Sequence, residues 1–167
     1  MSFSPVPRYS FHAVIDIGLE FLQKIGVKFL MLDLDNTIAA YGTDTLSAEM
    51  AQWAQTMKSG GIELFIISNT HKKERVAAFA KELSVEYVWF AKKPLPRGVR
   101  AAMESAGYGA HESALAGDQI FTDTLAANFA GVTSIIVKPV DYSNPILAFR
   151  YFLEKPFRAV CKNRMLK

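Results

Sequence analysis

Carboxylate, hydroxyl and ammonium side chains follow four short apolar runs of this sequence. The stretch "FLMLDLDNTIAAYG", residues 29–42, places two carboxylates one residue apart where such a run ends. Three later runs, "IELFII", "VEYVWFA" and "SALA", lead into "SNT", "KKP" and "GDQIFTD". The polar residues collected in this way are Asp33, Asp35, Asn36, Thr37, Ser68, Asn69, Thr70, Lys92, Lys93, Asp118, Gln119, Thr122 and Asp123. Carboxylates gathered without His or Cys form an oxygen-rich site, which suits Mg²⁺ rather than zinc or copper.

The paired carboxylates can divide one reaction between them. A carboxylate can attack phosphorus and form an aspartyl-phosphate, which splits one difficult displacement into two easier steps. Asp33 is the expected nucleophile, because it ends an apolar run and should be held rigidly. Asp35 can give a proton to the leaving oxygen and later accept one from water, as a general acid and base does.

The groups after the next two runs suit a transferring phosphoryl group. Ser68 can donate a hydroxyl hydrogen bond, and the amides around Asn69 and Thr70 are expected to open a helix whose N-terminus favours an anion. Lys93 can neutralise equatorial phosphoryl oxygens. Ser68, Asn69 and Lys93 are therefore the predicted phosphate-binding residues.

Three carboxylates, Asp33, Asp35 and Asp118, are the predicted Mg²⁺ ligands, because a bound cation would relieve their mutual repulsion. Asp123 lies five residues after Asp118, near the predicted start of the next helix. This residue could support the metal ligands or hold the Lys93 ammonium, and the sequence leaves both roles open.

The apolar runs alternate with segments of helical character. Strands are predicted at residues 28–34, 62–68, 85–91, 113–118 and 133–139 because these runs are rich in β-branched and aromatic residues. Helices are predicted at residues 46–59, 72–83, 97–106 and 122–130, and Gly60, Gly107 and Gly131 end three of them. Trp53 and Trp89 lie within apolar patterns and are predicted to be core residues.

This alternation predicts an α/β fold with a doubly wound parallel sheet of the Rossmann type. Strands that are apolar on both faces need helices on both faces, and parallel strands need crossover connections. In such a sheet, ligands bind beyond the carboxyl ends of the strands. All the polar residues collected above should therefore meet at one edge.

The four motifs "DLDNT", "SNT", "KKP" and "GDQIFTD" resemble, in order, those of the haloacid dehalogenase (HAD) superfamily. "AKKP" and "GDQIFTD" further resemble the YqeG-like family, which is related to mitochondrial phosphatidylglycerophosphate phosphatases. The resemblance implies a Mg²⁺-dependent phosphatase with Asp33 as nucleophile, Asp35 as acid and base, and Asp118 on the metal. It also places Ser68 and Lys93 on phosphate, because the functional lysine of the superfamily directly precedes proline.

Two features distinguish this sequence from other members of the superfamily and narrow the expected reaction: the residue at position 35 and the short segment available for a cap. Similarity to dehalogenases proper would predict no carboxylate at position 35, and similarity to P-type ATPases would predict Thr there, so Asp35 favours hydrolysis of a phosphomonoester. Many members also carry a cap domain, but residues 38–46 are long enough only for a small flap. The site of a capless or flap-bearing enzyme should be open and should admit bulky substrates, including a lipid head group.

Length and composition predict one domain, residues 1–167, with a catalytic core at about residues 28–140. Half of the 167 residues are hydrophobic, which suffices for one core. Cys161 is the only cysteine, so a reducing, cytoplasmic location is expected. No apolar run approaches the roughly 18 residues of a spanning helix, and a soluble protein is expected.

The C-terminal segment, residues 144–167, has a charge of +5, whereas the residues before Arg150 sum to −2. This split argues against nucleic-acid binding by the whole surface and leaves a local anionic contact open. Five apolar residues fall at roughly helical spacing in this segment: Phe149, Phe152, Leu153, Phe157 and Val160. The favoured interpretation is that they pack on the core while the basic residues are solvated. The alternative is a peripheral helix on anionic membrane.

Two functions of different classes therefore remain in view. The first is an enzyme that cleaves a phosphomonoester on a phosphorylated small molecule or a phospholipid head group, most specifically phosphatidylglycerophosphate by the family resemblance. The second is a phosphatase-like binding module whose basic tail engages a nucleic-acid or protein partner. The complete motif set favours the enzyme, because loss of Asp33 or Asp35 would mark a dead site. The sequence leaves the oligomeric state open.

Overall fold

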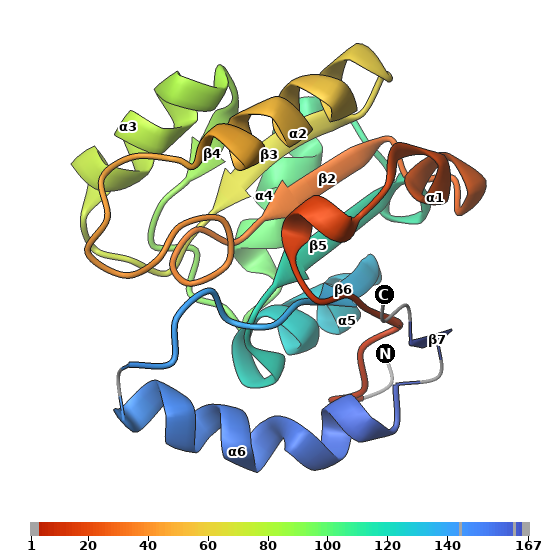
Figure 1. The fold of residues 1–167 in the computed structure, drawn as a ribbon. Coiled ribbons are helices and arrows are strands. Elements are labelled where there is room, and N and C mark those ends of the chain that lie inside the picture. The colour runs from red at the N-terminus through yellow and green to blue at the C-terminus, as the bar shows by residue number, and fades with distance from the viewer. Residues whose placement is uncertain (1–3, 144, 162, 165–167) are drawn as a thin grey trace.

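The computed structural model describes residues 4–143, 145–161 and 163–164, the last two by their backbone alone. A single sheet of seven strands runs through this part of the chain in the order β4-β3-β2-β5-β6-β1-β7 (Figure 1). Every strand pair in it is parallel. The strands are β1 (Tyr9–Ser10), β2 (Phe29–Leu32), β3 (Glu63–Ile67), β4 (Glu86–Val88), β5 (Ser113–Gly117), β6 (Thr133–Ile136) and β7 (Asn163–Arg164).

The strand order confirms the doubly wound α/β prediction. From the central strand β2 the chain moves outward through β3 to β4, then returns to β5 on the other side of β2 and continues to β6. The five predicted strands are all present, whereas β1 and β7 were not expected. Each of these two is only two residues long, which is too short to form a recognisable pattern.

Helices cover both faces of the sheet. They are α1 (Leu19–Lys24), α2 (Ala48–Ser59), α3 (Lys73–Leu83), α4 (Arg97–Ala106), α5 (Leu125–Ala130) and α6 (Pro145–Ala159), with single turns at Val14–Asp16, Ala110–Glu112 and Ile120–Thr124. The turn at Ile120–Thr124 is π-helical and forms the start of the helix predicted at residues 122–130, so the regular α-helix α5 is shorter than expected. The three predicted glycine ends are correct, and Gly107 and Gly131 adopt φ values of +77° and +81° that favour glycine.

The buried side chains of β2 alternate between two cores. Leu30 and Leu32 join the cluster that includes the inner faces of α2 and α3, whereas Phe29 and Met31 join the cluster with α4 and α5. This alternation places the two helix layers on opposite faces, as Figure 1 shows. The central strand ends at Leu32, so the next residues leave the sheet between the two layers.

The two tryptophans have different environments. Trp53 is buried on α2 and its Nε1 donates a hydrogen bond to the Ile17 carbonyl at 2.9 Å, which confirms the prediction for this residue. Trp89 follows the edge strand β4 and is 41% exposed, so the prediction that it belongs to the core is wrong. An apolar pattern at a sheet edge resembles one at its centre, and only the strand order distinguishes them.

The C-terminal helix α6 buries its charged side and exposes its apolar side, the reverse of the prediction. Glu154 and Arg158 are buried against the rest of the protein, whereas the row formed by Ile146, Phe149, Phe152, Leu153 and Val160 faces outward. The favoured prediction of an apolar stripe packed on the core is therefore wrong for Phe149, Phe152, Leu153 and Val160. Phe157, the fifth residue of that stripe, does pack edge-on against Phe121, with ring centroids 5.7 Å apart. None of the described helices is long and apolar enough to span a bilayer.

Hydrogen bonds to the loop after β5 explain why α6 buries its charged residues. Glu154 Oε1 accepts hydrogen bonds from the backbone N–H groups of Ile120 and Phe121 at 2.8 and 3.3 Å. Arg158 pairs with Glu154 Oε2 at 3.0 Å and donates to the carbonyls of Val137 and Asp118. The buried pair therefore ties α6 to the segment that carries Asp118.

We predict that Glu154→Ala lowers the free energy of unfolding by about 3 kcal/mol. The substitution leaves the Arg158 guanidinium buried without its carboxylate, and removes the acceptor of one buried and one partly buried N–H group. Urea denaturation measures the change. Lys155→Ala, at the next and exposed position, is the matched control and should change stability by less than about 0.5 kcal/mol. Equal effects of the two substitutions would contradict the assigned role of Glu154.

Candidate active site

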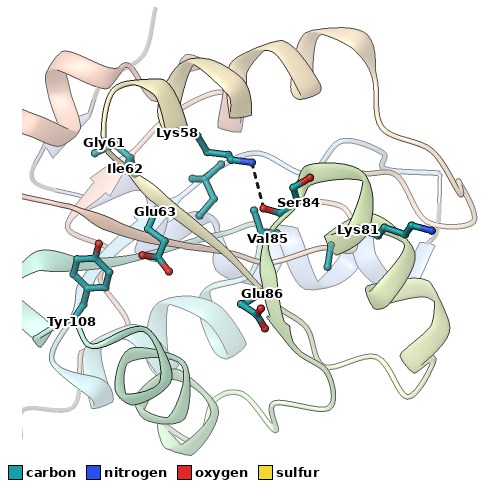
Figure 2. Close-up of a pocket in the computed structure, with 11 residues that line it drawn as sticks. Lys58, Gly61, Ile62, Glu63, Lys81, Ser84, Val85, Glu86 and Tyr108 are labelled. Atoms are coloured by element: carbon teal, nitrogen blue, oxygen red, sulfur yellow. Dashed lines mark hydrogen bonds between the residues drawn. The ribbon is translucent and has the colours of Figure 1, made fainter.

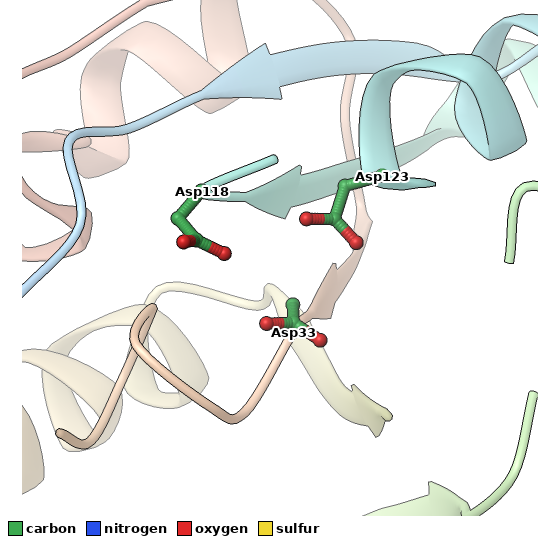
Figure 3. Close-up of side chains that lie close together, drawn as sticks. All are labelled: Asp33, Asp118 and Asp123. Atoms are coloured by element: carbon green, nitrogen blue, oxygen red, sulfur yellow. The ribbon is translucent and has the colours of Figure 1, made fainter. Parts of the chain in front are cut away.

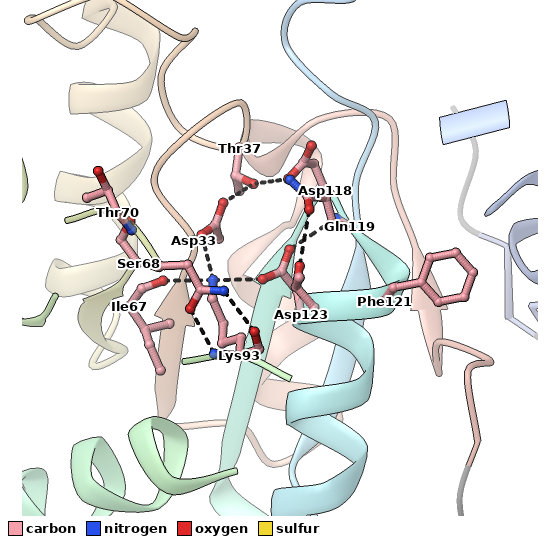
Figure 4. A network of polar contacts seen from close by, with 12 residues as sticks. Asp33, Thr37, Ile67, Ser68, Thr70, Lys93, Asp118, Gln119, Phe121 and Asp123 are labelled. Atoms are coloured by element: carbon pink, nitrogen blue, oxygen red, sulfur yellow. Dashed lines mark hydrogen bonds and ion pairs between the residues drawn. The ribbon is translucent and has the colours of Figure 1, made fainter. Parts of the chain in front are cut away.

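The carboxyl ends of β2, β3 and β5 and the loop after β4 surround a pocket of about 370 Å³. The structure brings together there the motif residues that the sequence placed at four separate strand ends. Figure 4 shows the polar contacts that connect them. The pocket is lined by Asp33, Asp35, Tyr41, Ser68, Asn69, Thr70, Lys93, Gln119, Thr122, Asp123 and Arg150.

Three buried carboxylates, those of Asp33, Asp118 and Asp123, converge at the carboxyl ends of β2 and β5 (Figure 3). One oxygen of each lies within 4.8 Å of the other two. A cluster of like charges this close needs cations, and its all-oxygen donor set fits a hard ion such as Mg²⁺. The residues present are therefore suited to hold a metal ion of this kind.

The buried ammonium of Lys93 supplies positive charge inside the same cluster. Lys93 Nζ lies 2.5 Å from Asp33 Oδ1 and 2.7 Å from Asp123 Oδ1, and it donates to the Ile67 carbonyl at 3.0 Å. The sequence left two positions open for Asp123, beside Lys93 or within the acidic cluster. In the structure its carboxylate lies in both. Lys92, by contrast, is exposed and its Nζ lies 5.0 Å from the centre of the Phe90 ring.

Burial determines the ionisation of this cluster in the absence of a metal. It raises the pKa of Asp33 to about 7, against the lowering effect of Lys93. Burial, followed by the charges of Asp33 and Asp123, raises the pKa of Asp118 well above its usual range. Burial alone would lower the pKa of Lys93, but Asp123 and Asp33 raise it by more, so this residue stays cationic. A metal ion must therefore compete with protons for the two aspartates.

Thr37 and Gly117 allow the carboxylates to approach one another. Thr37 Oγ1 lies 3.1 Å from Asp33 Oδ2 and 3.3 Å from Asp118 Oδ1, so its hydroxyl can donate to either. A Cβ atom at Gly117 would lie 2.3 Å from Asp123 Cγ. Glycine is therefore required at the end of β5 for Asp123 to reach the cluster. Neither residue had been given a role from the sequence.

The predicted phosphate-binding residues lie in the pocket with different freedom to bind. Ser68 Oγ accepts the N–H of Thr70 at 3.1 Å, which leaves its own hydrogen available to a ligand. The Asn69 side chain donates to the Lys93 carbonyl and accepts from the Lys93 N–H, both at 2.8 Å. It therefore holds the Lys93 backbone in place. The helix expected to open near these residues begins only at Lys73, so its N-terminus lies further along the chain.

Asp35 lines the pocket but its carboxylate lies outside the acidic cluster of Asp33, Asp118 and Asp123. Asp35 Oδ1 forms an ion pair with Arg75 of α3 at 3.1 Å, and Arg75 also donates to the carbonyls of Ala40 and Thr43 in the flap. The predicted placement of Asp35 among the metal ligands is therefore not supported by the position of its side chain. Its proximity to the pocket suits the proton transfers expected of it.

Three residues that line or support the pocket lie outside the sequence motifs. Tyr41 comes from the flap, Arg75 from α3 and Arg150 from α6. None of these belongs to a motif, and only the packing of distant segments brings them to the strand ends. Gln119 and Thr122 also line the pocket, and their place within the motif "GDQIFTD" is the sequence feature that indicates this position.

A larger hollow of about 680 Å³ lies near the amino ends of β3 and β4, away from the carboxyl ends that form the candidate site (Figure 2). Its carboxylates, Glu63 and Glu86, stand at the first residues of these strands. The acidic cluster with Lys93 is at the opposite ends of the strands. The chemistry therefore belongs to the smaller pocket.

The loop after the central strand that carries Asp33, a lysine before proline, and an acidic pair after β5 follow the arrangement expected of one superfamily. Fold and site together define a HAD-type phosphatase. The profile of the family described as "Mitochondrial PGP phosphatase" matches residues 3–141, and the chain belongs to that family.

Comparison with individual proteins agrees with this assignment. The chain is 30% identical over 131 residues to "Probable phosphatase YqeG" of Bacillus subtilis (strain 168), covering 78% of this chain and 76% of that protein. A 3-deoxy-D-manno-octulosonate 8-phosphate phosphatase from Moraxella catarrhalis, in complex with magnesium and phosphate ions, superposes with a TM-score of 0.58 at 21% identity, over 87% and 80% of the two chains. A putative HAD superfamily hydrolase from Legionella pneumophila gives 0.56 at 17%, over 79% and 75%. At this identity the two structures support the fold alone.

We predict that the metal-free protein is more stable at about pH 5.5 than at about pH 8. The folded-state pKa of Asp33, about 7, lies above its unfolded value of 3.8, so the folded state binds more protons between these values. This contribution is present at low pH and is lost as pH rises through about 7. Thermal unfolding in a chelator measures it.

Asp33→Asn should raise the stability of the metal-free protein at about pH 8 and flatten its pH dependence, because Lys93 keeps Asp123 as its partner. Glu82→Gln, on the exposed side of α3, is the matched control and should leave the pH dependence unchanged. A pH dependence of the Asn variant as steep as that of the wild type would show that Asp33 does not carry this titration.

Proposed function

We propose that this protein is a Mg²⁺-dependent phosphomonoester hydrolase that acts through an aspartyl-phosphate on Asp33, with phosphatidylglycerophosphate as its substrate. The observation that carries the reaction is the position of Asp33. Its carboxylate follows the central strand, contacts the Lys93 ammonium at 2.5 Å and faces the pocket that Asp35 also lines. A nucleophile, a cation and an acid–base group are thus close to one another.

In the first step, one Asp33 carboxylate oxygen attacks phosphorus and the bond from phosphorus to the substrate oxygen breaks. Asp35 gives its proton to that oxygen, so the product leaves as a neutral alcohol. Lys93 and the Ser68 hydroxyl stabilise negative charge on the transferring group. In the second step, Asp35 takes a proton from water, the water oxygen attacks phosphorus, and Asp33 and inorganic phosphate are released.

The carboxylates of Asp33, Asp118 and Asp123 would hold the metal. A bound Mg²⁺ would supply positive charge that offsets these carboxylates and the phosphoryl oxygens. The Thr37 hydroxyl lies between the Asp33 and Asp118 carboxylates and holds their positions relative to one another. The ion pair with Arg75 holds the Asp35 carboxylate apart from the cluster while Asp35 lines the pocket.

The choice of substrate rests on the family and on the pocket. The matching family is described by its activity on PGP, and no separate cap domain covers the site among the described residues. Phosphatidylglycerophosphate carries a second anionic group, its phosphodiester, close to the terminal phosphate. Arg150 lines the pocket, donates to Gln119 Oε1 at 2.5 Å and makes no carboxylate ion pair within the described chain. Its guanidinium is suited to the second anion.

The alternative of a phosphatase-like binding module gains no support from the site, in which every motif carboxylate is retained. A cytoplasmic location stays a prediction.

We predict that the purified protein releases inorganic phosphate from phosphatidylglycerophosphate dispersed in detergent when Mg²⁺ is present. A chelator should abolish release and excess Mg²⁺ should restore it. Asp33→Asn should lower kcat by at least about 10³-fold, because it removes the nucleophile. Near wild-type turnover by this variant would exclude the mechanism. Turnover of other phosphomonoesters but not of phosphatidylglycerophosphate would exclude the substrate while retaining the mechanism.

Arg150→Gln should separate the recognition of the second anion from catalysis. We expect kcat/KM for phosphatidylglycerophosphate to fall about tenfold, the worth of one charge-assisted hydrogen bond at a partly exposed site. Hydrolysis of para-nitrophenyl phosphate, which has a single phosphate, should change little. Lys81→Gln, on an exposed position of α3, is the control. Equal losses on both substrates would assign Arg150 to a structural role.

A further inference from the structure

The outward face of α6 is a continuous apolar row. Its members Ile146, Phe149, Phe152 and Leu153 are 72, 62, 60 and 47% exposed, and Val160, in the turn that follows the helix, extends the row and is 57% exposed. They recur at spacings of three, four and seven residues, which places them on one side of a helix. Pro156, at a helical position between them, is also exposed. We call this set, with Pro156, the α6 apolar row.

The inward side of the same helix determines which way the row points. Glu154 and Arg158 are buried and bonded to the loop after β5, and Arg150 reaches Gln119 in the pocket. Turning the helix over would expose these contacts and bury unpaired charge, at a cost far above any gain from covering the row. The row is therefore a stable feature of the surface.

The charges around the row favour an anionic partner. The only acidic side chain between Pro145 and Val160, Glu154, is buried on the inward side. Lys155 is exposed at the edge of the row, with its Nζ 5.3 Å from the Phe152 ring centre. An anionic surface would thus meet the row without repulsion.

The row also lies close to the pocket. Arg150 follows Phe149 directly, and its side chain lines the pocket while that of Phe149 is exposed. Figure 1 shows α6 along one side of the molecule, with its N-terminal half toward the carboxyl ends of the strands. A surface that covers the row therefore comes near the rim of the pocket.

We propose that the α6 apolar row docks this protein on an anionic lipid bilayer, an inference that rests on the proposed lipid substrate. The phenyl rings enter the boundary between head groups and acyl chains, while Lys155 remains among the anionic head groups. A symmetric contact between two copies is less suitable, because α6 presents no exposed acid that could pair with the Lys155 ammonium of the second copy.

The test is co-sedimentation of the whole chain with vesicles, which requires no turnover. One set of vesicles contains equal amounts of phosphatidylcholine and phosphatidylglycerol, and the other contains phosphatidylcholine alone. We expect binding to the anionic vesicles that weakens as salt is added. Phe149→Ser with Phe152→Ser should weaken it at least about tenfold, because two phenyl rings no longer leave water.

The matched control is Trp89→Ser with Leu95→Ser, two large apolar residues that are 41 and 58% exposed at and after the β4 edge of the sheet. This variant should bind vesicles as the wild type does. Lys155→Glu should weaken binding to anionic vesicles by more than about fivefold, and should leave binding to neutral vesicles nearly unchanged. Thermal unfolding checks that all variants are folded.

Absence of binding by the wild type, or equal binding by the Phe149/Phe152 variant, would overturn the proposal. Sedimentation equilibrium tests for a dimer. A dimer that the same substitutions abolish, in a protein that does not bind vesicles, would assign the row to a contact with a second copy and would also overturn the proposal. Turnover of detergent-dispersed phosphatidylglycerophosphate is measured in parallel. Retained turnover with failed vesicle binding would reject the docking alone, whereas the reverse result would reject the proposed substrate alone.

Discussion

The ion pairs of one buried ammonium hold the candidate site together. Lys93 contacts Asp33 and Asp123 at 2.5 and 2.7 Å, and without it three aspartates would share a buried space with no cation paired to their carboxylates. Much of the surrounding structure keeps this group in place. The Asn69 side chain holds its backbone from both sides, the Ile67 carbonyl accepts its third hydrogen, and Gly117 leaves the space through which Asp123 approaches. The negative charge that remains is what suits the site to a divalent cation and a phosphoryl group.

A second buried pair, Glu154 with Arg158, extends this organisation to the C-terminal helix. Its hydrogen bonds end on the backbone of Asp118, Ile120 and Phe121, so α6 supports the segment that carries Asp118. The cost of burying these charges is offset by the hydrogen bonds, and the consequence is that the apolar residues of α6 face outward. One helix thus contacts the loop that carries Asp118, contributes Arg150 to the pocket and exposes an apolar row beside it.

The ordered motifs predicted much of the site because three of them lie directly after a strand and the fourth, which contains Lys93, lies in the loop after β4. A residue such as Asp33 or Asp118 is placed by the end of its own strand, because ligands bind beyond the carboxyl ends of parallel strands. Arg75, Tyr41 and Arg150 could not be found in this way, since each reaches the pocket from an element whose position depends on packing. The same limit explains Asp35. Its spacing from Asp33 suggested a shared metal site, but Arg75 of α3, forty residues later in the chain, draws its carboxylate aside.

By itself, the sequence determined the alternation of strands and helices, the single parallel sheet and the identity of the polar groups at its carboxyl edge. These depend on local periodicity and on the chirality of crossover connections, which short segments encode. Only the tertiary structure decided which carboxylates converge and which way α6 faces. A helix with both apolar and charged residues can pack by either side, and the choice depends on whether distant backbone groups satisfy the buried charges. In this protein the N–H groups of Ile120 and Phe121 and the carbonyls of Asp118 and Val137 do so.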